Sequence, residues 1–175
     1  VVIENRPGAG GNVAAAALLG IPADGYTLMV TDGSMFTINP KLMKSLPYDP
    51  DKDFVPVVQL ARGPLFLAVH PKLPVSTFKE FIDHAKKNEV RYASAGIGAY
   101  QHVNTEILAK RAGGLQLLHI PFKDGGSGIL KEVASGDVHV TWFNITNPVG
   151  MIKAGKVLPL AIAAPERLKE WPDVP

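Results

Sequence analysis

The chain has 175 residues, of which 46% are hydrophobic and 19% are charged, and its formal net charge is +2. This length and apolar content suffice for one domain of ordinary size or for two small lobes. The small positive charge, without a basic run of five residues, does not indicate a nucleic-acid-binding protein. There is no cysteine, which excludes a thiol nucleophile, a disulfide and a thiolate metal site.

The N-terminal third begins with the segment ENRPGAGGN, residues 4–12, in which small residues leave the backbone bare. The apolar run at residues 13–19 follows at once and predicts the first helix. Two runs rich in β-branched and apolar residues come next, YTLMV at 26–30 and VPVVQLA at 55–61. Both predict buried strands.

The rest of the chain alternates between β-rich runs and helical runs. The clearest helix is 77–87, where Thr77 and Glu80 have the spacing of a capping box and apolar residues recur at helical intervals. Further helices are predicted at 101–112, at 128–135 and between Pro148 and Gly155, and strands at 65–70, 91–94, 115–120, 138–143 and 158–164. This alternation predicts an α/β fold with mostly parallel sheets.

Three predicted helices are preceded by a segment rich in glycine, at residues 8–12, 94–102 and 123–128. Bare amide N–H groups at a helix start attract anions, because they are free donors at the positive end of the helix dipole. Open α/β sheets bind ligands at the carboxyl ends of their strands. Three such segments therefore indicate an anion-binding site more strongly than one tight turn would.

Nucleotide-binding motifs are incomplete. Two dinucleotide-like patterns, at Gly8 and at Gly96, have Val13 and Gln101 where the third glycine is needed. The segment from Gly150 to Lys156 resembles a phosphate loop, but Val157 replaces the hydroxyl residue that would hold magnesium. A nucleotide site is not supported.

Catalytic and metal-binding patterns are also missing from the sequence. The histidines show no metal-ligand spacing, and His119 and His139 fall in predicted strands, which indicates a structural role. His102 follows a glycine-rich segment, so it either bonds to its own loop or forms a wall of the ligand site. No serine lies in a nucleophile motif. Arg6 could pair with an anionic ligand or with an acidic neighbour in the fold.

Several segments together resemble the Bug family, the extracytoplasmic receptors of tripartite tricarboxylate transporters. The resemblance is carried by ENRPGAGGN, PADGYTLMV, INPKLMKSLPYDPDKDFVPV, RYASAGIGAYQH, HIPFKDGG and IKAGKVLPLAIAAPER, and it covers nearly the whole chain. It implies a type II periplasmic binding-protein fold, in which two α/β lobes joined by two crossover strands hold a ligand between them. It also implies a periplasmic protein that binds a small organic carboxylate and delivers it to membrane transporter subunits.

The resemblance implies a first lobe at 1–62, a second lobe at 63–159 and a return to the first lobe at 160–175. Relatives begin with a further strand and end with a closing segment, so the first lobe is expected to be incomplete at both ends. No catalytic residue, metal or cofactor is expected, and the full-length protein is expected to be monomeric.

The resemblance places the ligand against the glycine-rich segments of both lobes. Many relatives carry an aspartate at the position of Asn144, where it suits a ligand ammonium group, so its absence argues against amino-acid ligands. The expected ligand-binding residues are Gly8, Ala9, Gly10, Gly11, Thr31, Asp32, Gly33, Ser34, Ser94, Gly96, Gly98, Ala99, Tyr100, His102, Gly125, Gly126, Ser127 and Asn144.

Two other classes of protein stay open from the sequence. A ligand-sensing domain of a regulator shares the bilobed fold and would be joined to a DNA-binding module. An enzyme acting on a phosphate ester could also use glycine-rich helix starts. Neither accounts for the full set of segments shared with the Bug family.

Overall fold

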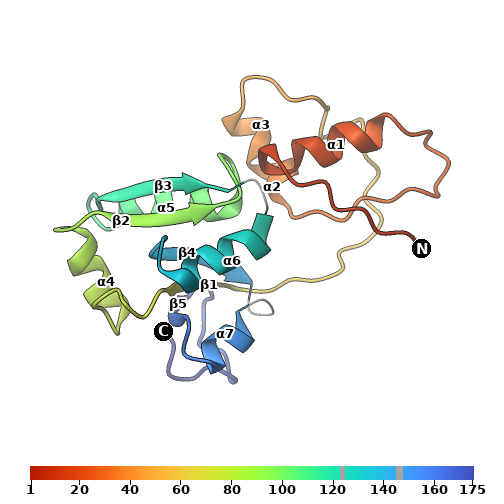
Figure 1. Ribbon diagram of the computed structural model, residues 1–175. Helices are drawn as coiled ribbons and strands as arrows, with labels where there is room; N and C mark the ends of the chain where they lie inside the picture. The colour runs from red at the N-terminus through yellow and green to blue at the C-terminus, as the bar shows by residue number, and fades with distance from the viewer. Residues whose placement is uncertain (123–124, 145–147) are drawn as a thin grey trace.

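The computed structural model describes residues 1–122, 125–144 and 148–175, and of residues 125–127 it describes the backbone alone. Figure 1 shows an N-terminal part of helices and extended chain, residues 1–64, beside a sheet part, residues 65–175. The N-terminal part contains the 3-10 helix η1 (Ala9–Gly11) and helices α1 (Asn12–Leu19), α2 (Ser34–Thr37) and α3 (Asn39–Leu42). The sheet part contains β1 (Leu65–Val69), α4 (Phe78–Ala85), β2 (Val90–Ser94), α5 (Tyr100–Arg111), β3 (Leu117–Pro121), α6 (Gly125–Ser135), β4 (Val140–Asn144), α7 (Val149–Lys153) and β5 (Leu158–Ile162).

The five strands form one mixed sheet in the order β3-β2-β4-β1-β5. Strand β2 is parallel to β3 and β4, whereas β1 is antiparallel to both of its neighbours, β4 and β5. Four strands therefore run in one direction and β1 runs against them. The predicted α/β class is confirmed, but the sheet is mixed rather than mostly parallel, because β1 pairs antiparallel with both β4 and β5.

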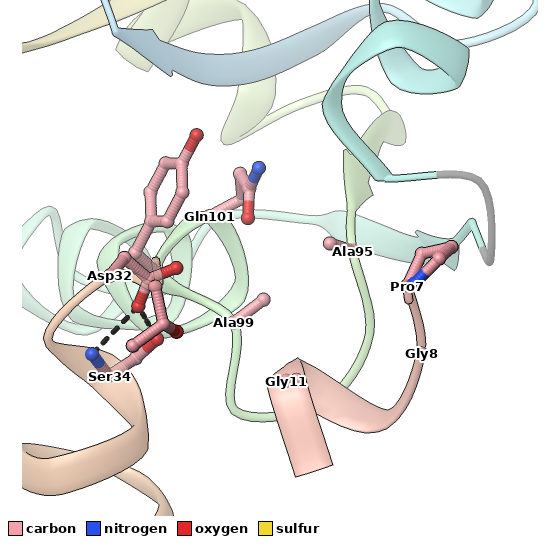
Figure 2. A pocket seen from close by; sticks show the side chains of 11 residues that line it. Pro7, Gly8, Gly11, Asp32, Ser34, Ala95, Ala99 and Gln101 are labelled. Carbon is pink, nitrogen blue, oxygen red and sulfur yellow. Dashed lines mark hydrogen bonds between the residues drawn. The ribbon is translucent and has the colours of Figure 1, made fainter. Parts of the chain in front are cut away.

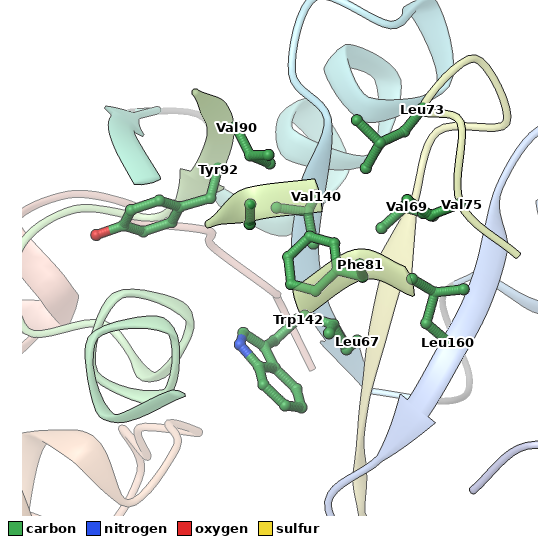
Figure 3. Close-up of a cluster of buried hydrophobic side chains, with 11 residues drawn as sticks. Leu67, Val69, Leu73, Val75, Phe81, Val90, Tyr92, Val140, Trp142 and Leu160 are labelled. Atoms are coloured by element: carbon green, nitrogen blue, oxygen red, sulfur yellow. The ribbon is translucent and has the colours of Figure 1, made fainter. Parts of the chain in front are cut away.

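Both faces of the sheet are covered, which explains why its strands are apolar along their length. Leu67, Val69 and Trp142 pack with Phe81 of α4 on one face, as Figure 3 shows. The alternate residues Ala68 and Phe143 lie in a second cluster with apolar residues of α6. Successive side chains on a strand point to opposite faces, so strands buried on both faces have continuous apolar runs.

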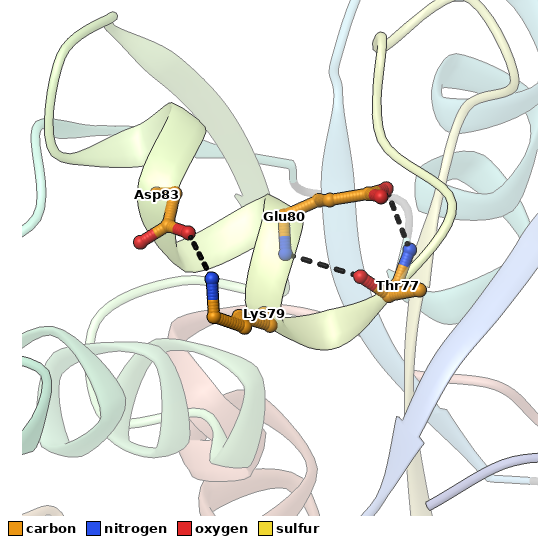
Figure 4. A network of polar contacts seen from close by, with 4 residues as sticks. All are labelled: Thr77, Lys79, Glu80 and Asp83. Carbon is orange, nitrogen blue, oxygen red and sulfur yellow. Dashed lines mark hydrogen bonds and ion pairs between the residues drawn. The ribbon is translucent and has the colours of Figure 1, made fainter.

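Helix α4 begins with the capping box that its sequence predicts. The hydroxyl of Thr77 accepts a hydrogen bond from the Glu80 amide at 3.2 Å, and the Glu80 carboxylate accepts from the Thr77 amide at 3.2 Å (Figure 4). Two amides that helix formation leaves without partners are thereby satisfied. The Lys79–Asp83 ion pair on the exposed side, at 3.0 Å, contributes little because solvent screens it.

Helix α5 confirms the predicted helix at 101–112 to within one residue at each end. Helix α6 begins at Gly125, three residues before the predicted start at Gly128. The glycine-rich segment before it was expected to be a loop, but its last glycines are part of the first turn of the helix. Among the described residues, no helix is long and apolar enough to cross a membrane.

The strands predicted at 26–30 and 55–61 are wrong. Both segments are extended chain without a strand assignment, and Leu28 and Val58 are each 70% exposed. A strand is stable only when a neighbouring strand pairs with its amides and carbonyls. The described residues provide neither segment with such a neighbour, so β propensity alone does not make a strand there.

Apolar packing in the N-terminal part is limited to a small cluster. Ala15 of α1, Met35 of α2 and Tyr48 are buried together, with Phe54 packed at the edge. At the other end of the chain, Trp171 packs edge-on against Phe66 of β1, with ring centroids 5.9 Å apart. The division into lobes at 1–62, 63–159 and 160–175 stays a prediction.

We expect Thr77→Ala to lower the free energy of unfolding by about 1 kcal/mol, because the variant loses the side-chain cap of α4. Chemical denaturation measures this change. Thr27→Ala is the matched control, because Thr27 is exposed in extended chain. Equal stability losses in the two variants would contradict a role for the capping box.

Candidate functional site

A pocket of about 150 Å³ lies between the N-terminal part and the start of α5. Figure 2 shows Asp32 and Ser34 on one side of it and Pro7 and Ala95 on the other. Its lining residues are Pro7, Gly8, Gly10, Gly11, Thr31, Asp32, Ser34, Ala95, Ala99, Tyr100 and Gln101. Pockets for drug-sized ligands occupy about 300–1,000 Å³, so this one suits a small molecule.

Residues 8–11, here called the glycine turn, form one wall of the pocket. Their backbone angles are ones that residues with a side chain disfavour. Gly8, Gly10 and Gly11 have φ of 133°, 62° and 92°. A Cβ at Gly11 would lie 2.9 Å from the Met35 side chain, so α2 packs directly on the bare backbone. Glycine is required here both by its conformation and by the close approach of Met35.

Two helices start at the pocket without a side-chain cap. The N-cap residue of α1 is Gly11 and that of α5 is Ala99, and neither provides a capping oxygen. The two starts come from different parts of the chain and face the same pocket. The Asn12 amide, the first of α1, already donates to the Ala9 carbonyl. The positive ends of both helix dipoles and the first amides of α5 still favour an anion in this space.

The third helix start at the pocket, that of α2, is already occupied by Asp32. The Asp32 carboxylate accepts hydrogen bonds from the Ser34 amide, at 2.7 Å, and from the Ser34 hydroxyl. Burial and the nearby Asp32 charge raise the pKa of Tyr100 to about 12. The Tyr100 phenol therefore stays protonated and remains a hydrogen-bond donor at neutral pH.

Gln101 extends the pocket wall beyond the residues that sequence analysis selected. Its side chain is 2% exposed, and its Oε1 has no hydrogen-bond partner in the described part of the chain. It lies in the first turn of α5, directly after Ala99 and Tyr100. The sequence signal that could have found it is a polar residue in the first turn of a helix that follows a glycine-rich segment.

Ser94 and His102 lie behind the pocket wall rather than in it. The Ser94 hydroxyl is fully buried, 2.5 Å from His119 Nε2, and accepts a bond from the Gly96 amide at 3.0 Å. The His119 ring stacks on Tyr92 at a centroid distance of 4.8 Å, and the His102 ring lies tilted against it at 4.7 Å. This arrangement holds the loop before α5 in place, and the buried serine is not accessible to a substrate.

Some of the predicted site residues line the pocket and others lie outside it. The pocket is lined by Gly8, Gly10, Gly11, Thr31, Asp32, Ser34, Ala99 and Tyr100 but not by Ala9, Gly33, Ser94, Gly96, Gly98 or His102. His102 instead borders a second hollow, with Leu42 and Glu106. Asn144 is exposed at the end of β4. Gly125, Gly126 and Ser127 begin α6, but their side chains lie outside the described residues.

Other polar candidates have partners within the fold. Arg6 pairs with Glu4 at 2.8 Å. Of the two partners considered for Arg6, a ligand or an acidic neighbour, the structure shows the acidic neighbour. His139, predicted to lie in a strand, immediately precedes β4, and its ring accepts a bond from the Arg91 amide at 3.1 Å. In the described ranges, no three histidine, aspartate or glutamate residues cluster as metal ligands would.

A pocket between two parts of an α/β chain, with uncapped helix starts beside it, suits the binding of a small anionic solute. The model of the tripartite tricarboxylate transporter family receptor matches residues 1–175. The chain belongs to this receptor family. The resemblance to the Bug family and the type II periplasmic binding-protein fold are both confirmed.

Solved structures support the same assignment. The periplasmic binding protein BugD is 30% identical, with a TM-score of 0.90 over 100% of this chain and 58% of its own. R. palustris Rpa4515 with adipate is 32% identical (TM-score 0.92; 99% and 58% covered). MatC from Rhodopseudomonas palustris with bound malate is 31% identical (TM-score 0.88; 96% and 57% covered). The chain spans about half the length of the curated relatives it matches.

We expect Gly11→Ala to destabilise the protein by about 1–3 kcal/mol, because alanine disfavours positive φ and its Cβ would displace Met35. Gly63→Ala is the control, because no heavy atom lies within 4 Å of the position its Cβ would take. Chemical denaturation of both variants tests this expectation. A stable Gly11→Ala variant would show that the close contact with α2 is not required.

Acidification should weaken the fold through His119. Burial and the neighbouring His102 lower the pKa of His119 below its ordinary value of 6.5. Below that value the unfolded chain binds more protons than the folded protein, so the free energy of unfolding falls as the pH falls. His119→Gln should show a smaller loss of stability between about pH 7.5 and about pH 5.5. An unchanged pH dependence would assign the loss to other groups, such as His139.

Proposed function

We propose that the protein is an extracytoplasmic receptor that binds a small organic carboxylate in the pocket between the glycine turn and the start of α5. The observation that carries this proposal is the meeting of two uncapped helix starts, from α1 and α5, at one pocket. A carboxylate there would accept hydrogen bonds from backbone amides. Each such bond to a charged group contributes about 1.5–3 kcal/mol net.

The ligands of the structural neighbours support this chemistry. Rpa4515 was solved with adipate and MatC with malate, and both are small dicarboxylates. The pocket volume of about 150 Å³ is compatible with ligands of this size. We propose that this protein also accepts an organic acid of a few carbon atoms.

The ligand would be held from both lobes, with the first lobe at residues 1–62 and the second at 63–159. The proposed contacts include the pocket-lining residues. They also include residues that the family resemblance selects and that lie outside this pocket, namely Ala9, Gly33, Gly96, Gly98, His102, Gly125, Gly126, Ser127 and Asn144. In this proposal the receptor is periplasmic and monomeric and transfers its ligand to the membrane subunits of a tripartite tricarboxylate transporter.

A thermal-shift screen of the full-length gene product tests the carboxylate proposal. At 100 times its dissociation constant, a ligand should stabilise the protein by about 2.7 kcal/mol. We expect stabilisation by one or more dicarboxylates and none by ATP or NAD. The corresponding uncharged diamides are the control, because they keep the length of the ligand and remove the anionic groups. Stabilisation by nucleotides but by no carboxylate would reject the proposal.

A further inference from the structure

The Gln101 side chain is an unusual group to find in the wall of a small pocket. It is 2% exposed, and its Oε1 has no partner among the described residues. A buried acceptor that has lost its water without gaining a hydrogen bond lowers the stability of the fold. Such a group is explained when a bound ligand supplies the missing donor.

The surroundings of Gln101 fix its position but leave the acceptor free. Its backbone carbonyl accepts a bond from the Thr105 hydroxyl at 2.7 Å, one turn along α5. Figure 2 shows the amide between Asp32 and Ala95, at the edge of the pocket away from Gly11. The neighbouring wall residues Ala95 and Ala99 have no polar side chain, so they cannot donate to it.

The position of Gln101 also restricts the kind of donor. A carboxylate only accepts hydrogen bonds, so the ligand needs a second group. An ammonium group would lie at the positive end of the α5 dipole, which disfavours a cation. The Asp32 carboxylate in the same wall would attract a cation, but it already accepts hydrogen bonds from the Ser34 amide and hydroxyl. A hydroxyl group is neutral and can donate one hydrogen bond to one buried acceptor.

We infer that Gln101 Oε1 accepts a hydrogen bond from a hydroxyl group of the bound acid, so that the receptor selects hydroxycarboxylates over the unsubstituted acids of the same length. This inference rests on the proposed carboxylate-binding function. The two helix starts bind the carboxylate, and Gln101 accepts the hydrogen bond from the hydroxyl group beside it. Gln101 is thus a specificity-determining residue.

Calorimetric titration of the full-length gene product tests the inference with matched pairs of acids. The pairs are succinate with malate and glutarate with 2-hydroxyglutarate, and aspartate is the ammonium analogue of malate. We expect the hydroxylated member of the tighter-binding pair to bind about tenfold more tightly. Aspartate should bind more weakly than malate.

Gln101→Leu should remove this preference, because leucine has a similar size and no acceptor. The affinity for the unsubstituted acid should stay within about twofold of the wild type. The melting temperature of the unliganded variant should not fall, because an apolar side chain replaces a buried acceptor without a partner. Gln116→Leu is the control, because Gln116 is exposed in the loop between α5 and β3 and should leave the preference intact.

The possible failures are distinguishable. If no carboxylate binds, both the proposed function and the inference are wrong. If carboxylates bind but the two members of each pair bind equally, only the inference is wrong. A hydroxyl preference that persists in Gln101→Leu, or aspartate binding more tightly than malate, would also overturn it and leave the receptor function standing.

Discussion

The pocket depends on one buried side chain, that of Asn39 in α3. Its Nδ2 donates to the Gly10 carbonyl and to the Asn12 side chain, each at 3.1 Å, and thereby fixes the glycine turn. Its Oδ1 faces Gly98 of the sheet part, where a Cβ would lie only 3.0 Å away. The absence of a side chain at Gly98 lets the two parts approach, and the start of α5 then faces the start of α1.

The two walls of the pocket rest on different amounts of packing. The α5 wall is supported by a sheet covered on both faces. The glycine-turn wall rests on a small cluster around Met35 and Tyr48. Segments with few buried contacts are less stable, so the described residues support the α5 wall more than the glycine-turn wall.

The chemistry of the pocket is divided between its backbone and its side chains. The backbone supplies donors at two helix starts, whereas the side chains of Asp32 and Gln101 supply acceptors. An anionic acid with a neutral donor satisfies both kinds of group. The Ser94–His119 contact lies behind the wall and supplies neither kind of group to the pocket. It supports the loop that precedes α5.

The sequence by itself determined the elements whose signals are local or repeated. The capping box at Thr77 needs no distant partner, and helix α5 follows from its own apolar residues and the glycine that comes after it. The glycine-rich segments likewise indicated which backbone would line the site. Tertiary structure alone decided that residues 26–30 and 55–61 are not strands, because pairing depends on a neighbour in space. It also decided that Gln101 and not His102 faces the pocket, because each step along a helix turns the side chain by about 100°.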